Sequence, residues 1–97
     1  MAFQRKVAII NGSRTPFVKS MTNYQGVSNQ DMLTAVTNDL VAKYKLEGKV
    51  LGDFISGSVM NHPFDFNLSR EVVLGSKLSP LTPGMNIQFA CGTGLEA

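Results

Sequence analysis

The last ten residues read Gln88-Phe89-Ala90-Cys91-Gly92-Thr93-Gly94-Leu95-Glu96-Ala97. Just before the cysteine, apolar and polar side chains alternate with the two-residue period of a strand, over Met85, Asn86, Ile87, Gln88 and Phe89. The residues after the second glycine favour a helix. The segment therefore predicts a strand that turns into a helix, with Cys91, the single cysteine of the chain, at the turn.

Segments upstream alternate between strand-like and helix-like patterns. Residues 6–11 contain the run Val7-Ala8-Ile9-Ile10, which is too short for a helix and apolar on both faces, as in a central strand of a parallel sheet. A helix is predicted to begin after Ser28, where Asp31 completes a capping box, and to end at Gly48. Its apolar face is formed by Leu33, Val36, Leu40, Val41 and Tyr44.

A second strand is predicted around residues 54–59 and is followed by a second helix that Asn67 caps. This helix must end before Pro80, because a residue that precedes proline avoids the helical region. Residues 12–29 and 78–84 lack a period and are predicted to be connections. The apolar face of the second helix is formed by Leu68, Val72, Val73 and Leu74.

The predicted order is strand, helix, strand, helix, strand, followed by the start of a further helix. Such alternation is typical of an α/β fold with parallel strands joined by right-handed crossovers, and function then lies at the carboxyl ends of the strands. A chain of 97 residues suffices for one small domain with a modest core. Residues 1–97 show no internal boundary, repeat or low-complexity run.

Cys91 is the candidate catalytic residue. A cysteine at the first turn of a helix faces unpaired N–H groups and the positive end of the helix dipole, which favour the nucleophilic thiolate. Gly92 and Gly94 suit a tight turn, and the amide of Cys91 could then donate to a developing oxyanion. The alternative is that the cysteine is a small buried apolar residue without a chemical role.

Composition excludes several classes of protein. The chain is 43% hydrophobic and 16% charged, it has no long apolar run, and it has one cysteine, so neither a transmembrane span nor a disulfide framework is predicted. We expect a cytoplasmic protein or one of an organellar matrix. The formal charge of +2 would suit a polyphosphorylated ligand, but the basic residues are scattered and no nucleic acid is expected. No spacing of His, Cys and carboxylates predicts a metal site.

Several segments together resemble the thiolases, acyl-CoA acyltransferases that make and break 3-ketoacyl thioesters. Residues 91–97 are similar to their nucleophile signature, in which a small residue, Ser or Thr, Gly, an apolar residue and Ala follow the reactive Cys. Residues 7–17 look like the opening strand and Arg-Thr-Pro turn of that family. Residues 57–59 and 67–75 resemble its second strand and its Asn-x-x-Arg helix, especially in thiolases of fatty-acid β-oxidation. Residues 60–66 differ, because a Pro and aromatic residues replace the Gly-rich loop of biosynthetic relatives.

The resemblance implies an incomplete N-terminal half of the thiolase fold and an enzyme in which Cys91 carries the acyl group. It implies coenzyme A and acyl-CoA as substrates, no permanently bound cofactor, and a homodimer, a homotetramer or a complex with a β-oxidation subunit. The family's catalytic histidine, second cysteine and remaining oxyanion-hole groups have no counterparts in these residues. The 97-residue chain alone is therefore expected to be inactive, with Cys91 reacting more like an ordinary cysteine.

Other interpretations of the same residues stay open. Gly92-x-Gly94-x-x-Ala97 after a strand also fits a dinucleotide-binding fingerprint, and a non-catalytic interaction module is a third possibility. Ketoacyl synthases and hydroxymethylglutaryl-CoA synthase share the fold, but the Arg-Thr-Pro segment and the Gly-Thr-Gly after Cys91 favour thiolases.

Three further side chains are given no catalytic role. His62 lies in Asn61-His62-Pro63, which resembles the family's Gly-His-Pro segment only superficially because the surrounding glycines are missing. Arg14 could contact phosphate but is expected to be exposed or to brace its loop. Arg70 is expected to be tied to neighbouring carbonyls or to a partner subunit. No cofactor-binding residue is assigned.

Overall fold

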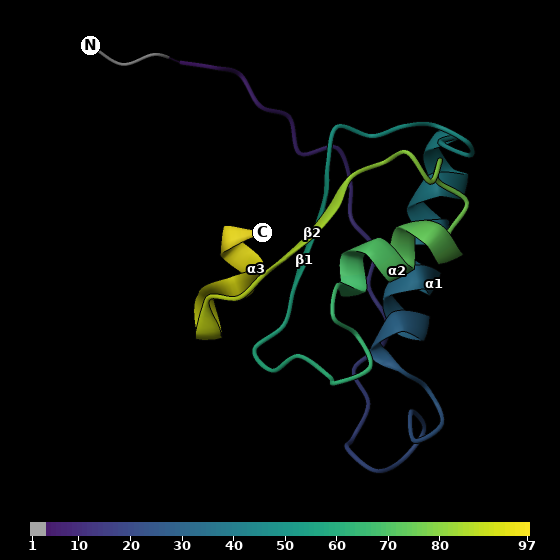
Figure 1. Ribbon diagram of the computed structural model, residues 1–97, viewed down its shortest axis with the longest axis vertical. Coiled ribbons are helices and arrows are strands. Elements are labelled where there is room, and N and C mark those ends of the chain that lie inside the picture. The colour runs from purple at the N-terminus through teal and green to yellow at the C-terminus, as the bar shows by residue number, and fades with distance from the viewer. Residues whose placement is uncertain (1–3) are drawn as a thin grey trace.

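The structure is a computed structural model that describes residues 4–97. It is a small α/β arrangement in which a pair of strands has helices on both sides (Figure 1). The elements in chain order are α1 (Asn29–Tyr44), β1 (Phe54–Gly57), α2 (Leu68–Gly75), β2 (Gly84–Ile87), the 3₁₀ turn η1 (Ala90–Gly92) and α3 (Thr93–Glu96).

The strands β1 and β2 pair in parallel, with Phe54 opposite Gly84 and Gly57 opposite Ile87. Because parallel strands need a crossover, the connection between them contains α2. Figure 1 shows α1 and α2 on one side of the strand pair and α3 on the other. The predicted parallel strands with a helical crossover are confirmed over this part of the chain.

The capping box predicted for the first helix is present. Ser28 Oγ accepts from the N–H of Asp31 at 3.0 Å, and Asp31 Oδ2 accepts from the N–H of Ser28 at 3.0 Å. The helix ends earlier than predicted, because Lys45 adopts a left-handed conformation with φ +54° and its N–H bonds to the carbonyl of Val41. Gly48, with φ +73°, belongs to the turn that follows and does not end the helix.

Asn67 caps α2 as predicted and also connects it to the sheet. Its side-chain oxygen accepts from the N–H of Arg70 at 3.0 Å, and its amide nitrogen donates to the carbonyl of Gly84 at 3.1 Å. Of the predicted apolar face of α2, Leu74 is wrongly assigned because it is 53% exposed. The buried apolar residues of the core are Val41, Leu68, Val72, Val73 and Leu78.

The strand predicted over residues 6–11 is wrong for this structure. Val7, Ile9 and Ile10 are 87%, 95% and 76% exposed, and the segment belongs to no strand. It runs away from the body of the molecule, as the purple trace in Figure 1 shows. A strand requires a hydrogen-bonded neighbour as well as apolar cover, and among residues 4–97 the sheet consists of β1 and β2.

The chain from residue 12 to residue 28 is a connection, as predicted. Ser13 Oγ donates to Asp39 Oδ2 at 2.7 Å, which fastens this connection to α1. Tyr24 Oη donates to the carbonyl of Pro16 at 2.8 Å and closes a loop.

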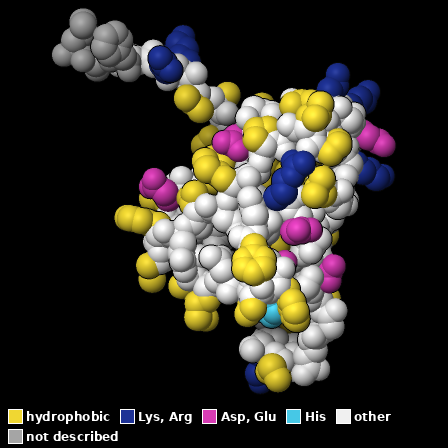
Figure 2. Space-filling view, viewed as in Figure 1, with side chains coloured by type: hydrophobic (Ala, Val, Ile, Leu, Met, Phe, Trp, Pro, Cys, Tyr) yellow, Lys and Arg dark blue, Asp and Glu magenta, His cyan; other side chains and the backbone are white. Residues whose placement is uncertain are grey.

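Figure 2 shows apolar side chains spread over the visible face. Within residues 4–97, no helix combines the length and the apolar character that crossing a membrane requires.

Candidate active site

Cys91 lies in η1, between the carboxyl end of β2 and the start of α3. It is exposed and has no disulfide partner. The strand-to-helix turn expected at this position is therefore present, although β2 ends at Ile87, two residues before the predicted Phe89. The thiol stands at the same edge of the sheet as the carboxyl end of β1, since the two strands run in parallel.

Three hydrogen bonds hold the backbone on either side of the cysteine. Thr93 Oγ1 accepts from the N–H of Phe89 at 2.8 Å and donates to the carbonyl of Ala90 at 2.7 Å. The N–H of Gly92 donates to the carbonyl of Phe89 at 2.9 Å. Cys91 is the middle residue of a five-residue loop, residues 89–93, that these bonds close.

The residue with an unusual backbone conformation in this loop is an alanine. Ala90 has φ +43°, a left-handed conformation that is unfavourable for a residue with a Cβ atom. Gly92 has φ −92°, which any residue adopts, and Gly94 also lies outside the left-handed region. The strained residue is therefore the one just before Cys91. At Gly92 the absence of a side chain matters for a different reason, because a Cβ atom there would lie 2.8 Å from the Phe89 ring.

Thr93 also packs against the carboxyl end of β1. A Cβ atom placed on Gly57 would lie 2.2 Å from Thr93 Cγ2 and 2.8 Å from the carbonyl oxygen of Ile87. Thr93 is only 5% exposed, because α3 lies over this glycine. The absence of a side chain at Gly57 thus leaves the space that the threonine methyl group occupies.

A second connection joins the segments that follow the two strands. Gln88 Nε2 donates to the carbonyl of Val59, so the residues after β1 lie beside those that lead to Cys91. Together with the contact between Gly57 and Thr93, this bond fixes the cysteine loop at the carboxyl edge of the sheet. Functional groups of parallel sheets gather at this edge.

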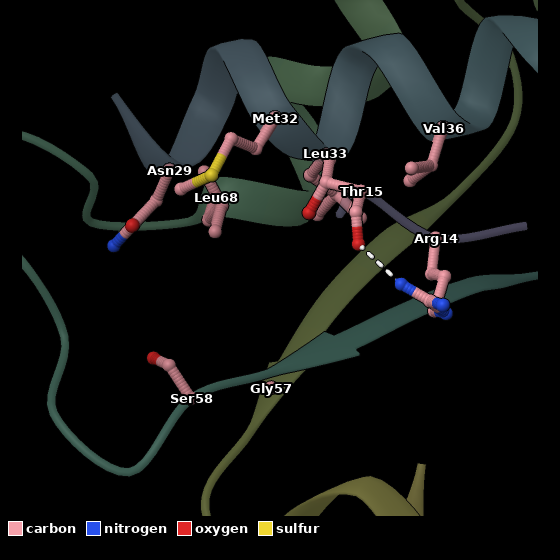
Figure 3. Close-up of a pocket in the computed structure, with 9 residues that line it drawn as sticks. All are labelled: Arg14, Thr15, Asn29, Met32, Leu33, Val36, Gly57, Ser58 and Leu68. Atoms are coloured by element: carbon pink, nitrogen blue, oxygen red, sulfur yellow. Dashed lines mark hydrogen bonds between the residues drawn. The ribbon is translucent and has the colours of Figure 1, made fainter. Parts of the chain in front are cut away.

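A cleft of about 400 Å³ opens at the end of β1, on the α1 side of the strands (Figure 3). Apolar side chains of α1 and α2 form one wall, and Figure 3 shows Arg14 and Ser58 across from them. Cys91 does not line this cleft. The lining residues are Arg14, Thr15, Asn29, Met32, Leu33, Val36, Gly57, Ser58 and Leu68.

The two arginines brace local structure, as predicted. Arg70 Nη1 donates to the carbonyl of Thr82 at 3.0 Å and so holds the loop before β2. Arg14 Nη1 donates to the carbonyl of Thr15 at 3.2 Å, and its guanidinium carbon lies 4.9 Å from the centre of the Phe17 ring.

His62 lies in the loop between β1 and α2. Its Nδ1 accepts from the N–H of Phe64 at 3.2 Å, and the two rings stack with their centres 5.0 Å apart. These contacts agree with a packing role. Within residues 4–97, no group of three His, Cys, Asp or Glu side chains is arranged to hold a metal ion.

The sequence interpretation missed Thr93, Gly57 and Ala90. A threonine hydroxyl often bonds to backbone groups a few residues away, so the position of Thr93 two residues after the cysteine was an available signal. The roles of Gly57 and Ala90 had no comparable signal, because they depend on how distant segments meet.

The family model described as "Thiolase, N-terminal domain" matches residues 7–97. Three similar curated proteins carry the name 3-ketoacyl-CoA thiolase and come from Shewanella sp. (strain W3-18-1), Shewanella amazonensis and Shewanella baltica. They are 36%, 35% and 36% identical over 92 residues, which is 95% of this chain and 21% of each relative. The chain thus spans about one fifth of the length of these curated relatives.

Proposed function

Because this chain belongs to the thiolase family, we propose that it is the N-terminal portion of an acyl-CoA C-acyltransferase that forms or cleaves 3-ketoacyl-CoA through an acyl group on Cys91. The observation that carries the proposal is the exposed thiol on a hydrogen-bonded turn at the carboxyl edge of the sheet. Curated relatives named 3-ketoacyl-CoA thiolase, 35–36% identical over 95% of the chain, support it.

The proposed reaction begins with attack of the Cys91 thiolate on the thioester carbonyl of an acyl-CoA. A new bond forms between Sγ and the acyl carbon, the bond from that carbon to the sulfur of coenzyme A breaks, and the released sulfur takes up a proton. The amide of Cys91 is proposed to donate to the oxyanion during this step. In synthesis, the acyl group then passes to the α-carbon of a second acyl-CoA, which loses a proton, and the free cysteine is restored. In cleavage, the thiolate attacks the 3-keto carbon, the bond between C2 and C3 breaks, the leaving acetyl-CoA carbon takes up a proton, and the thiol of coenzyme A accepts the acyl group from Cys91.

The rest of the active site is proposed to come from outside residues 1–97. Nucleophile and base act as a unit, so a chain without the activating histidine and the second cysteine loses almost all activity. We therefore propose that the 97-residue chain alone has no turnover and is an incomplete half of the thiolase fold. Coenzyme A and acyl-CoA are its proposed substrates, with no permanently bound cofactor.

The complete protein is proposed to be a dimer, a tetramer or a complex with a β-oxidation subunit, in the cytoplasm or an organellar matrix. Exposed apolar side chains such as Phe66 and Leu95 are compatible with burial in a larger assembly.

Acyl labelling tests the function directly. The protein expressed from its full coding sequence is incubated with acetyl-CoA, and its intact mass and peptide map are recorded. We expect one acetyl group on Cys91 and none on the Cys91→Ala variant. Labelling of another residue, or no labelling, would contradict the proposal, and tight NAD(H) binding without labelling would favour a dinucleotide-binding domain.

A separate assay tests the inactivity of the short chain. The purified 97-residue chain is mixed with acetoacetyl-CoA and coenzyme A, and loss of the substrate is followed. No turnover above the background rate is expected. Turnover that Cys91→Ala abolishes would show that these residues suffice for catalysis.

A further inference from the structure

We propose that Thr93 is a positioning residue for Cys91, because its hydroxyl closes the loop that presents the thiol and its methyl group seats that loop on β1. The inference rests on the proposed function of Cys91 and adds a residue that acts through the nucleophile. Thr93 does not need to touch substrate for this role.

The hydroxyl group of Thr93 makes two hydrogen bonds, one as acceptor and one as donor. It accepts from the N–H of Phe89 and donates to the carbonyl of Ala90, at 2.8 and 2.7 Å. Both partners precede Cys91, whereas Thr93 follows it, so the two bonds connect the two sides of the cysteine. Thr93 is buried, so its end of these bonds is shielded from water, although Phe89 and Ala90 are exposed residues.

The strained backbone beside the cysteine gives these bonds a specific task. Ala90 is held at φ +43°, and such a conformation persists only where the surrounding structure enforces it. The carbonyl of Ala90 accepts both from Thr93 Oγ1 and from the N–H of Thr93. Loss of the hydroxyl leaves one bond on that carbonyl and removes the acceptor of the Phe89 N–H, so the turn can relax.

The methyl group provides the second constraint. Thr93 Cγ2 lies in the space that a Cβ atom on Gly57 would need. Gly57 is the last residue of β1 and pairs with Ile87, so the loop rests on the paired end of the sheet. Thr93 therefore holds the loop in two ways. Its hydroxyl group bonds to the loop backbone, and its methyl group contacts β1.

Catalysis is sensitive to such placement, because a shift of about 1 Å in a reacting group can cost on the order of 100-fold in rate. A relaxed loop moves Sγ of Cys91 and its amide together, and both are proposed to act in the acylation step. The loss should therefore appear in kcat, while KM for acyl-CoA, which reports binding by other groups, changes little.

The test compares four forms of the protein expressed from its full coding sequence: wild type, Thr93→Val, Thr93→Ser and Thr93→Ala. Valine keeps the shape of threonine without the hydroxyl, and the Ser and Ala variants differ from each other only in Oγ. We expect kcat for 3-ketoacyl-CoA cleavage to fall by about 10–100-fold in the Val and Ala variants, with KM nearly unchanged. The Ser variant keeps the hydroxyl group but lacks Cγ2, so its kcat should fall by less than that of the Val and Ala variants.

Amide hydrogen exchange of Phe89 gives a readout that does not depend on activity. It should be slow in the wild type and in Thr93→Ser, and at least about tenfold faster in the Val and Ala variants, because loss of the bond to Oγ1 opens that N–H to water. If Thr93→Val does not fold, the matched Ser and Ala variants decide the question.

Two results would overturn the inference: wild-type kcat in the Val and Ala variants, or a Ser variant as impaired as the Ala variant. Failure of the proposed function is distinguishable from either result, because wild-type Cys91 would then not be acylated, while exchange at Phe89 would still report on the loop.

Discussion

The side-chain oxygen of Asn86 accepts a hydrogen bond from the backbone N–H of Ser69 at 2.9 Å, and this bond ties β2 to the first turn of α2. Ser69 is fully buried and extends the connection to both strands. Its hydroxyl donates to the carbonyl of Met85 at 2.7 Å and accepts from the N–H of Ser56 at 3.1 Å. The hydroxyl oxygens of Ser56 and Ser69 lie 2.5 Å apart and share a hydrogen bond.

This arrangement predicts that Ser69→Ala destabilises the chain by about 1–3 kcal/mol, since it removes two or three hydrogen bonds of about 0.5–1.5 kcal/mol each between α2 and the two strands. The midpoint of urea unfolding, followed by circular dichroism, measures the effect. Ser20→Ala is the matched control, because Ser20 is exposed. Equal midpoints for the two variants would show that Ser69 is not the connection between helix and strands.

The hydrogen bond between Ser13 and Asp39 predicts a lowered pKa for the Asp39 carboxyl group. The hydroxyl of Ser13 donates to the carboxylate and lowers the pKa of Asp39, and Lys43 Nζ, 3.0 Å from the same oxygen, lowers it further. A lowered pKa stabilises the folded state above the ordinary pKa of an aspartate, and this stabilisation is lost as the pH falls through the lowered value. Ser13→Ala should therefore raise the pKa of Asp39.

Carbon-detected NMR of the Asp39 carboxyl group measures that pKa, with Ser20→Ala as the control variant. The experiment also reports where the connection before α1 lies, since only a segment beside α1 can place Ser13 at this carboxylate. An unchanged titration in Ser13→Ala would mean that the connection does not lie there.

The features that the sequence predicts well are those set by neighbours in the chain. The capping box of Ser28 and Asp31 and the cap at Asn67 need only three residues of separation, and both form as expected. The alternation before Cys91 predicts β2 for the same reason, because side-chain direction in a strand depends on local geometry alone.

The features that were predicted wrongly or missed depend on distant segments. Val7, Ile9 and Ile10 carry the pattern of a central strand, yet the pattern cannot say whether a neighbouring strand is available. Gly57 ends β1 and Thr93 begins α3, so their contact joins segments far apart in the chain, and no local sequence pattern predicts it. Local sequence thus located the cysteine at the turn but not the residues that shape the turn.

Gly57→Ala tests how tightly the loop is seated. The added Cβ would lie 2.8 Å from the backbone oxygen of Ile87, so the strand pair itself must shift, and overpacking of this kind costs about 1–3 kcal/mol. Gly52→Ala is the control, because nothing lies within 4 Å of the corresponding Cβ position. The urea midpoint should fall in Gly57→Ala and stay near the wild-type value in Gly52→Ala.

Combination of Gly57→Ala with Thr93→Ser separates the two contacts. The serine lacks Cγ2, so it removes the contact at 2.2 Å and leaves the one to Ile87. We expect the double variant to recover part of the stability lost in Gly57→Ala. A double variant less stable than the sum of the two single changes would contradict the packing of Thr93 on Gly57.

Ala90→Gly tests the strained residue before the cysteine. A left-handed alanine costs about 1–2 kcal/mol, and glycine removes that cost, while the greater freedom of glycine in the unfolded chain returns about 0.5–1 kcal/mol. The substitution should therefore leave the stability unchanged or slightly raised. Ala35→Gly, at an exposed position inside α1, should instead cost about 1 kcal/mol. Urea unfolding of the two variants decides, and an equal loss in both would show that Ala90 is not held in the left-handed conformation.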